Sequence, residues 1–314
     1  MRKFERKPTA ASFDAKPGEG SEAAAASKPP PAAASAGMLK GLVIVATPIG
    51  NMSDITLRAL DTLRGAHAIA CEDTRVTAKL LARHGISAKL VAYNDHNAPR
   101  VRPLLLQRLR RGETVALVSD AGTPLISDPG YKLVREAVAE GLPVVGLPGP
   151  SAALAALVVS GLPTDRFLFA GFLPPKSAAR RAALAELAPV RASLIVFESG
   201  PRLAACLADM ATELGPREAA VARELTKLFE EVRRGTLAEL AGHYETAGPP
   251  KGEIVIVAGP PATPTEVSDT DLDEQLQVAL SRLSRRDAVA AVAAATGAPR
   301  KRVYERALAL RSEP

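Results

Sequence analysis

Five short segments of the sequence carry side chains that could bind a ligand or act on it chemically. Each follows a short apolar run and is rich in glycine, proline or polar residues: Thr47–Asp54, Cys71–Arg75, Tyr93–Asn97, Ser119–Gly130 and Leu147–Ala152. Carboxylates and histidine can accept protons, and glycine lets a ligand approach the backbone. One such segment alone is explained by the needs of a turn. Five of them after successive apolar runs favour a binding or catalytic site.

The segment Ser119–Gly130 is the most informative of the five. It reads SDAGTPLISDPG, which is longer than a strand-to-helix turn requires, and long loops in compact domains are usually functional. The glycine spacing matches neither GxGxxG nor GxxxxGK[ST], which argues against an NAD or ATP site. The sequence also lacks the HExxH, GxSxG and paired-cysteine motifs of metallopeptidases, serine hydrolases and zinc sites. Two isolated cysteines, Cys71 and Cys206, fit a reducing cytoplasm.

The elements that must position these segments alternate between short apolar runs and helical patterns. This rhythm is typical of an α/β fold with an open parallel sheet, in which ligands bind outside the carboxyl ends of the strands. The predicted strands are Leu42–Ala46, Ala68–Cys71, Leu90–Tyr93, Val115–Val118 and Val144–Leu147. The predicted helices are Thr56–Leu63, Thr74–Arg83, Ala98–Arg110 and Tyr131–Glu140, with a fifth beginning near Ser151.

A second domain is predicted after a hinge at Gly161–Asp165. The short connection Leu225–Phe229 indicates a hairpin, so this sheet should be mixed. Its predicted strands are Phe167–Ala170, Leu194–Glu198, Ala219–Glu224, Glu230–Gly235 and Ile254–Ala258, with helices Ser177–Leu187 and Arg202–Leu214. Three more helices, Leu272–Leu283, Arg286–Thr296 and Lys301–Leu310, predict a small helix-turn-helix-like domain.

Length, composition and charge narrow the class of protein. The chain has 314 residues, of which 47% are hydrophobic and 24% charged, enough for a substantial core, and its apolar runs are too short to span a bilayer. Its net charge is +6, and the stretch from Ser281 to Pro314 holds eight basic and three acidic residues. That excess favours a polyanionic partner. The predicted parts are a disordered extension (1–38), two α/β domains (39–161 and 162–260), a linker (261–270) and a basic helical domain (271–314).

Several motifs together resemble those of the tetrapyrrole methylase superfamily. They are TPIGN, EDTR, SDAGTPLISDPG, LPGPSA, GFLP, RELTK and KGEIVIVAG, spread from about Leu39 to Gly259. Within the superfamily they are most similar to the ribosomal RNA ribose 2′-O-methyltransferases. The resemblance implies a two-domain class III methyltransferase fold, S-adenosylmethionine as methyl donor in a cleft between the α/β domains, and a homodimer. It also implies a substrate in 16S ribosomal RNA of the small subunit, with the decoding-site cytidine as target.

The resemblance also implies which residues bind the donor. Porphyrin-precursor members of the family carry GDP where this chain has Gly122, Thr123 and Pro124, so no aspartate is expected at that point of the pocket. The implied donor-binding residues are Pro48, Ala121, Gly122, Thr123, Ile126, Ser151, Ala152, Glu198, Leu225 and Ile254.

Transfer to a ribose hydroxyl needs no metal but benefits from a base, because the hydroxyl is a weak acid. The expected proton acceptors are His96, Glu72 and Asp73. Histidine is the residue type best suited to accept a proton near neutrality, although a loop-capping role explains His96 equally well. The expected RNA contacts are Arg75, Lys176, Arg300, Lys301, Arg302 and Arg306.

Two other readings remain open at this point. A methylase of a small anionic tetrapyrrole precursor would share the fold and the donor, and a binding protein without catalysis would share the fold. A solvated basic helix explains the tail as well. The basic tail and the GTP sequence at Gly122–Pro124 favour RNA.

Overall fold

The computed structural model describes residues 39–261 and 268–310. The predicted disordered extension over residues 1–38 and most of the predicted linker lie outside the described residues. The first described domain is built on a five-stranded sheet with the order β3-β2-β4-β1-β5, in which all neighbours are parallel. Its strands are β1 (Leu42–Val45), β2 (Ala68–Cys71), β3 (Leu90–Ala92), β4 (Val115–Val118) and β5 (Val144–Leu147). The predicted parallel sheet is confirmed.

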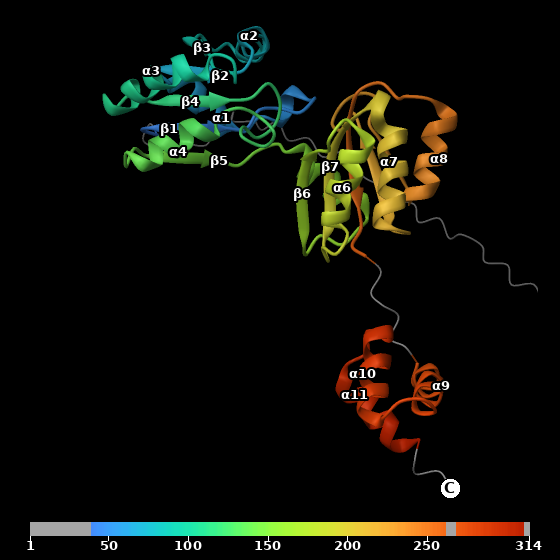
Figure 1. The fold of residues 1–314 in the computed structure, drawn as a ribbon. Coiled ribbons are helices and arrows are strands. Elements are labelled where there is room, and N and C mark those ends of the chain that lie inside the picture. The colour runs from blue at the N-terminus through green and yellow to red at the C-terminus, as the bar shows by residue number, and fades with distance from the viewer. Residues whose placement is uncertain (1–38, 262–267, 311–314) are drawn as a thin grey trace, which may run out of the picture. The chain divides into compact units, whose positions relative to one another are not determined.

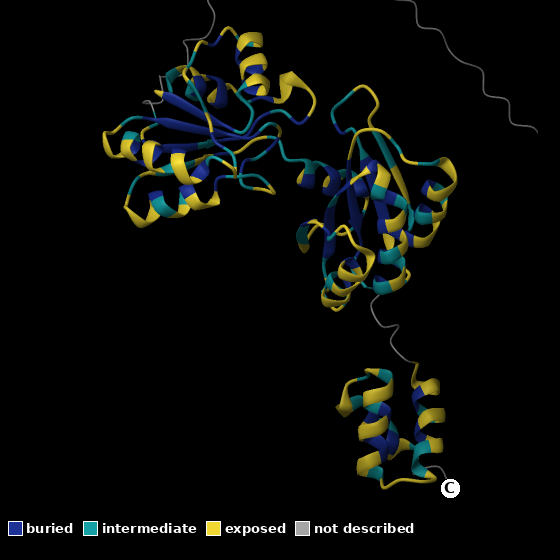
Figure 2. Cartoon of the chain, turned by 45° about the horizontal axis from the view of Figure 1, so that its top comes forward, coloured by how far each residue is buried: buried dark blue, intermediate teal, exposed yellow. Residues whose placement is uncertain are grey.

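Helices cover both faces of this sheet, which explains why its central strands are apolar throughout. Leu63 of α1 and Leu80 of α2 pack on one face, whereas Leu105 of α3 and Leu133 of α4 pack on the other. The bounds are α1 (Leu57–Gly65), α2 (Thr74–Arg83), α3 (Ala98–Arg110) and α4 (Tyr131–Ala139), with a short 3-10 helix, η1, at Met52–Asp54. Figure 2 shows the buried strands between these layers.

The second domain contains a mixed five-stranded sheet of order β6-β7-β10-β8-β9, as predicted. Only β6 and β7 pair in parallel, and β8 and β9 form the expected antiparallel hairpin. The strands are β6 (Phe167–Phe172), β7 (Ser193–Ser199), β8 (Glu218–Arg223), β9 (Glu231–Thr236) and β10 (Glu253–Ala258). Helices α6 (Ser177–Leu187), α7 (Gly200–Leu214) and α8 (Leu237–Ala247) cover one face of it (Figure 1).

Helix α5 (Ala152–Ser160) follows the last strand of the first sheet but packs on the second. Ala153, Ala156 and Leu157 contact Ile195, Ala222 and neighbouring side chains on the face opposite α6–α8. The helix thereby joins the loop after β5 to the second sheet. Helix α8 was not predicted, although a capping box of Thr236 and Glu239 marks its start.

The C-terminal domain has three helices, α9 (Asp269–Leu280), α10 (Arg285–Thr296) and α11 (Arg300–Ala309). Leu272, Leu276, Val289, Val292 and Val303 form its own core. Gly297 ends α10 in the left-handed conformation, with φ of 69°, which lets the chain turn into α11. Across the described residues no helix has both the length and the apolar character needed to cross a membrane.

Candidate functional site

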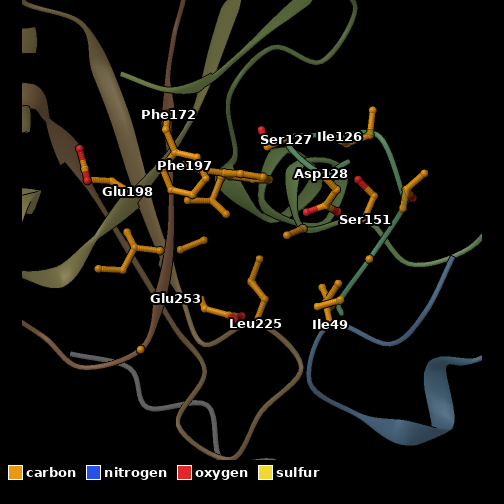
Figure 3. A pocket seen from close by; sticks show the side chains of 18 of the residues that line it. Ile49, Ile126, Ser127, Asp128, Ser151, Phe172, Phe197, Glu198, Leu225 and Glu253 are labelled. Carbon is orange, nitrogen blue, oxygen red and sulfur yellow. The ribbon is translucent and has the colours of Figure 1, made fainter. Parts of the chain in front are cut away.

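A cavity of about 360 Å³ collects the loops after β1, β4 and β5 and the facing edge of the second sheet (Figure 3). Asp128 and Ser151 stand on one wall, and Phe172 and Phe197 stand on the opposite one. The lining residues are Ile49, Ala121, Gly122, Thr123, Ile126, Ser127, Asp128, Ser151, Ala152, Phe172, Phe197, Glu198, Ser199, Ala222, Leu225, Gly252, Glu253, Ile254 and Val255.

Hydrogen bonds hold the three loops of the first domain together at this cavity. Thr47 and Gly122 exchange two backbone hydrogen bonds of 2.9 and 3.0 Å, and Thr47 Oγ1 donates to the Ser119 carbonyl at 3.2 Å. Thr123 Oγ1 donates to the carbonyl of Pro150 at 2.9 Å. The long loop between β4 and α4 is therefore fixed to both neighbouring loops.

Two of the four non-glycine residues with positive φ in the described chain lie in the same loop. Leu125 and Ser127 have φ of 73° and 66°, a left-handed conformation that costs non-glycine residues free energy. Gly122 has φ of 80°, and a Cβ there would lie 3.3 Å from Ile49 Cγ2, at the cavity wall. The loop geometry thus accounts for a glycine at this position and marks the segment as a candidate binding loop.

The electrostatic character of the cavity is acidic. Asp128, Glu198 and Glu253 line it, and no lysine, arginine or histidine does so among the described residues. Burial raises the pKa of Asp128, an effect that a hydrogen bond from Ser119 partly offsets and the nearby charge of Asp120 reinforces. Arg202 and Lys227 pair with Glu198 and Glu253 at 3.1 and 3.0 Å from outside the lining, so Asp128 contributes most of the negative charge that a positively charged ligand would meet.

The carboxylate of Glu198 is held by hydrogen bonds at the carboxyl end of β7. Its side chain is fully buried, and its Oε1 accepts a hydrogen bond of 2.8 Å from the backbone N–H of Ser199. The guanidinium of Arg202 lies 3.1 Å from Oε2, which lacks a well-oriented hydrogen bond within the described chain. Glu198 therefore retains hydrogen-bonding capacity toward a ligand.

The opposite wall is aromatic and aliphatic. The rings of Phe172 and Phe197 meet edge to face with centroids 5.6 Å apart, and Phe169 packs on Phe197 at 4.9 Å. Leu225 and Ile254 extend the apolar surface. A planar, uncharged ring of a ligand can pack closely against these side chains and leave water.

Nine of the ten residues expected to bind the donor line this cavity. The exception is Pro48, which instead lines a smaller cavity beside it. The sequence interpretation missed Asp128, Phe172, Phe197 and Glu253. Asp128 was visible within the long loop, and Phe172 lies in the GFLP motif, but nothing in the sequence showed that they face the same space.

The three expected proton acceptors line neither of these two cavities. His96 is exposed beyond β3, which is an edge strand of the first sheet. Asp73 caps α2 and forms an ion pair of 2.6 Å with Arg75, whose hydrogen bonds lower the pKa of Asp73 to about 2. Burial, with nearby carboxylates, raises the pKa of Glu72. No cluster within the described chain has the side chains to hold a metal ion.

The expected RNA contacts fall into separate places. Arg75 is engaged with Asp73 on α2, and Lys176 is exposed at the start of α6. In the C-terminal domain, Arg302 pairs with Asp269 at 2.8 Å and Arg306 pairs with Asp273. Arg300 and Lys301 instead line a hollow of about 540 Å³ between α10 and α11, together with Arg285, Arg286, Val289 and Tyr304.

Comparison with known proteins places this geometry in context. Residues 41–241 match the model of the tetrapyrrole (corrin/porphyrin) methylases, and residues 266–311 match the model of the RsmI C-terminal HTH domain. Ribosomal RNA small subunit methyltransferase I of Erythrobacter litoralis is 56% identical over 272 residues, covering 87% of this chain and 96% of the relative. The protein of that name from Mesorhizobium japonicum is 52% identical over 271 residues, covering 86% and 92%.

Solved structures share the fold at lower identity. The cobalt precorrin-4 methyltransferase CbiF superposes with a TM-score of 0.52 and 19% identity, covering 69% of this chain and 94% of its own. Uroporphyrin-III C-methyltransferase of Thermus thermophilus, complexed with S-adenyl homocysteine, has a TM-score of 0.50 and 21% identity, covering 70% and 97%. Both similarities cover about 70% of this chain and show a common fold.

Proposed function

The chain belongs to the tetrapyrrole methylase family, and on that premise we propose that it methylates a ribose 2′-hydroxyl in 16S ribosomal RNA, using S-adenosylmethionine. The proposed nucleotide is the decoding-site cytidine, and the proposed setting is the small ribosomal subunit in the cytoplasm. One observation carries the donor assignment: the motif loops enclose a cavity with three carboxylates and, among the described residues, no basic side chain. The names of the relatives support ribosomal RNA as the acceptor.

The residues of the cavity fit this donor. S-Adenosylmethionine supplies an activated methyl group and carries positive charge on its sulfonium and ammonium groups, which suit a cavity lined by carboxylates and, among the described residues, by no basic side chain. Phe197, with Leu225 and its apolar neighbours, offers a surface for the adenine ring. The cavity volume, about 360 Å³, is within the range of small-molecule sites.

Two features outside this cavity favour RNA over the alternative substrate, a small anionic tetrapyrrole. The C-terminal domain presents a hollow lined by Arg285, Arg286, Arg300 and Lys301, and residues 266–311 match the model of the RsmI C-terminal HTH domain. The relatives of 52% and 56% identity are named as ribosomal RNA methyltransferases.

For the proton acceptor the geometry favours Asp128 over His96, Glu72 and Asp73. Asp128 lines the cavity, and its raised pKa makes the carboxylate a stronger base than an ordinary aspartate. Asp73, with a pKa of about 2, is a weak base. We assign Asp128 to accept the proton of the 2′-hydroxyl while the strained loop holds it in place.

The basic hollow of the C-terminal domain, formed by Arg285, Arg286, Arg300, Lys301 and Tyr304, is the proposed RNA contact. Arg286, Arg300, Lys301 and Tyr304 are exposed. Guanidinium and ammonium groups suit phosphates, and a tyrosine ring can stack on an unpaired base. Arg302 and Arg306 instead stabilise the packing of α11 on α9 through their aspartate partners. This divides the expected RNA contacts of the tail into two binding and two structural residues.

We also propose a homodimer. Leu154 and Val158 follow one another by a turn on α5 and are 49% and 71% exposed, and Phe167 of β6 is 46% exposed. Leu154 and Val158 are neighbours on one face of α5, and contiguous exposed apolar side chains mark contact surfaces. Sedimentation of the purified chain at twice its monomer mass is the expected result.

Transfer of labelled methyl from S-adenosylmethionine to small ribosomal subunits that lack the modification tests the function directly. The expected product carries label in 16S RNA, and the phosphodiester 3′ to the labelled nucleotide resists alkali, because the 2′-oxygen no longer attacks it. Label on a base, or in a tetrapyrrole and not in RNA, would refute the proposal.

A further inference from the structure

A second cavity of about 210 Å³ adjoins the first on the β2 side of the sheet. Ile49, Ala121 and Glu253 line both cavities and form the boundary between them. Residues that line the second cavity are Thr47, Pro48, Ile49, Gly50, Met52, Val76, Thr77, Leu80, Ser119, Asp120, Ala121, Lys227 and Glu253.

One buried hydroxyl in this cavity has only a weak partner. Thr77 is 3% exposed, and its Oγ1 makes no hydrogen bond of normal geometry to a nitrogen or oxygen within the described chain. It interacts with the thiol of Cys71, whose pKa is raised by burial and lowered somewhat by a hydrogen bond with this hydroxyl. Because a thiol is a weak hydrogen-bonding group, the hydroxyl keeps the capacity to donate to a ligand.

Asp120 provides a fixed acceptor in the same cavity. Its Oδ1 accepts a hydrogen bond of 3.1 Å from the backbone N–H of Asp73, which orients the carboxylate. A carboxylate has room for further hydrogen bonds, so the rest of the group can receive N–H donors from a ligand.

The size and the apolar walls of this cavity suit a single ring. Met52, Val76 and Leu80 are apolar, and the volume is below the roughly 300 Å³ at which sites for drug-sized ligands begin. Lys227 closes one side, where its Nζ donates to Glu224 at 2.7 Å and Glu253 at 3.0 Å. Gly50 leaves room for this lysine, because a Cβ there would clash with its side chain.

We propose that the second cavity binds the nucleobase of the methylated nucleotide, and that Asp120 and Thr77 select a base with an exocyclic amino group, cytosine. Asp120 accepts from the amino group, as carboxylates do with cytosine N4, and Thr77 Oγ1 donates to a ring or carbonyl acceptor. The ribose then lies at the boundary formed by Ile49 and Ala121, facing the donor cavity. This inference rests on the proposed function and extends it to base selection.

Single-stranded RNA makes such binding feasible. Proteins recognise unpaired bases by turning them out of the strand and bonding their edges, at an unstacking cost that is small in loops. A base in the second cavity would hold its ribose beside the donor cavity. The same contact would then position the 2′-hydroxyl and recognise the base.

The substitution Asp120→Asn tests the proposal with little disturbance. Asparagine keeps an oxygen for the Asp73 N–H and places an amide N–H₂ where the carboxylate accepted, so the cavity would then present a donor. Single-turnover methyl transfer is measured on ribosomal RNA fragments with cytidine or uridine at the target position. The wild type is expected to prefer cytidine, and the variant is expected to lose about 10-fold or more of that preference.

Two more variants sharpen the result. Thr77→Val keeps the shape of the side chain and should raise KM for the cytidine RNA about fivefold, with kcat and donor affinity little changed. Asp61→Ala is the control, because Asp61 is exposed on α1 and pairs only locally with Arg64 at 3.0 Å; it should leave the preference intact. Unchanged cytidine preference in Asp120→Asn, together with unchanged KM in Thr77→Val, would overturn this inference and leave the proposed function standing. A wild type that methylates no ribosomal RNA would overturn the proposed function as well.

Discussion

Replacing Arg300 and Lys301 with alanine should weaken RNA binding, whereas replacing Arg302 and Arg306 should mainly loosen the C-terminal domain. Both double variants remove two positive charges from the same helix, α11. The first pair lines the basic hollow. The second pair is bound to Asp269 and Asp273 on α9, 33 residues earlier in the chain.

The magnitude follows from counterion release. Each phosphate contact to single-stranded RNA contributes about 0.7 to the slope of log affinity against log salt, so two lost contacts lower that slope by about 1.4. Over a fourfold change in salt, the salt-induced loss of affinity should then shrink by roughly sevenfold. The variant Arg302→Ala/Arg306→Ala should keep the wild-type slope, because in the wild type these two arginines pair with aspartates and are not expected to displace counterions from RNA.

The assay is fluorescence anisotropy of a labelled 16S fragment with the full chain at 50 to 200 mM salt, where screening changes strongly. Circular dichroism on heating follows the melting of all the helices, in which loosening of α9–α11 should appear as an earlier loss of part of the signal, and donor affinity by calorimetry serves as the internal control. Equal slopes for wild type and Arg300→Ala/Lys301→Ala would refute the assignment of the hollow to RNA. A reduced slope with normal melting in Arg302→Ala/Arg306→Ala would show that the ion pairs do not restrain those arginines.

Further predictions concern the donor cavity. Gly122→Val should lower donor affinity at least tenfold in calorimetry, since its φ of 80° and the 3.3 Å approach to Ile49 leave no room for a branched side chain; wild-type affinity would mean that the ligand binds elsewhere. Asp128→Asn should slow single-turnover transfer by about 10² or more, and His96→Ala should stay within a few fold, in chemical-quench experiments. Because the pKa of Asp128 is raised and the carboxylate is the active form, the wild-type rate should rise with pH through a midpoint above the ordinary aspartate value; a rate that falls over that interval would exclude it as the base. Transfer should be unchanged by a chelator, as measured by incorporation of label.

The sequence by itself determined the order and type of most elements and the segments that carry the chemistry. Apolar runs such as Val115–Val118 indicate buried strands because helices must cover both faces of a parallel sheet, and the loop Ser119–Gly130 stands out by length and composition alone. Helix α8 was not predicted, although Leu237, Leu240 and Tyr244 recur at helical spacing and Thr236 caps its start. The donor-site residues came from resemblance of motifs, which requires no knowledge of distances.

Only the tertiary structure decided which of these residues act together. Asp128 and Glu198 line one cavity although they belong to different domains, and Pro48 lines the neighbouring cavity although it lies beside Ile49. His96 resembled a base in the sequence, yet the strand order leaves it at an edge of the sheet. Arg302 looked equivalent to Arg300 until helix packing brought it to Asp269. Local sequence fixes propensity and charge, but contacts between distant residues depend on how strands are ordered and helices packed, and these are properties of the whole fold.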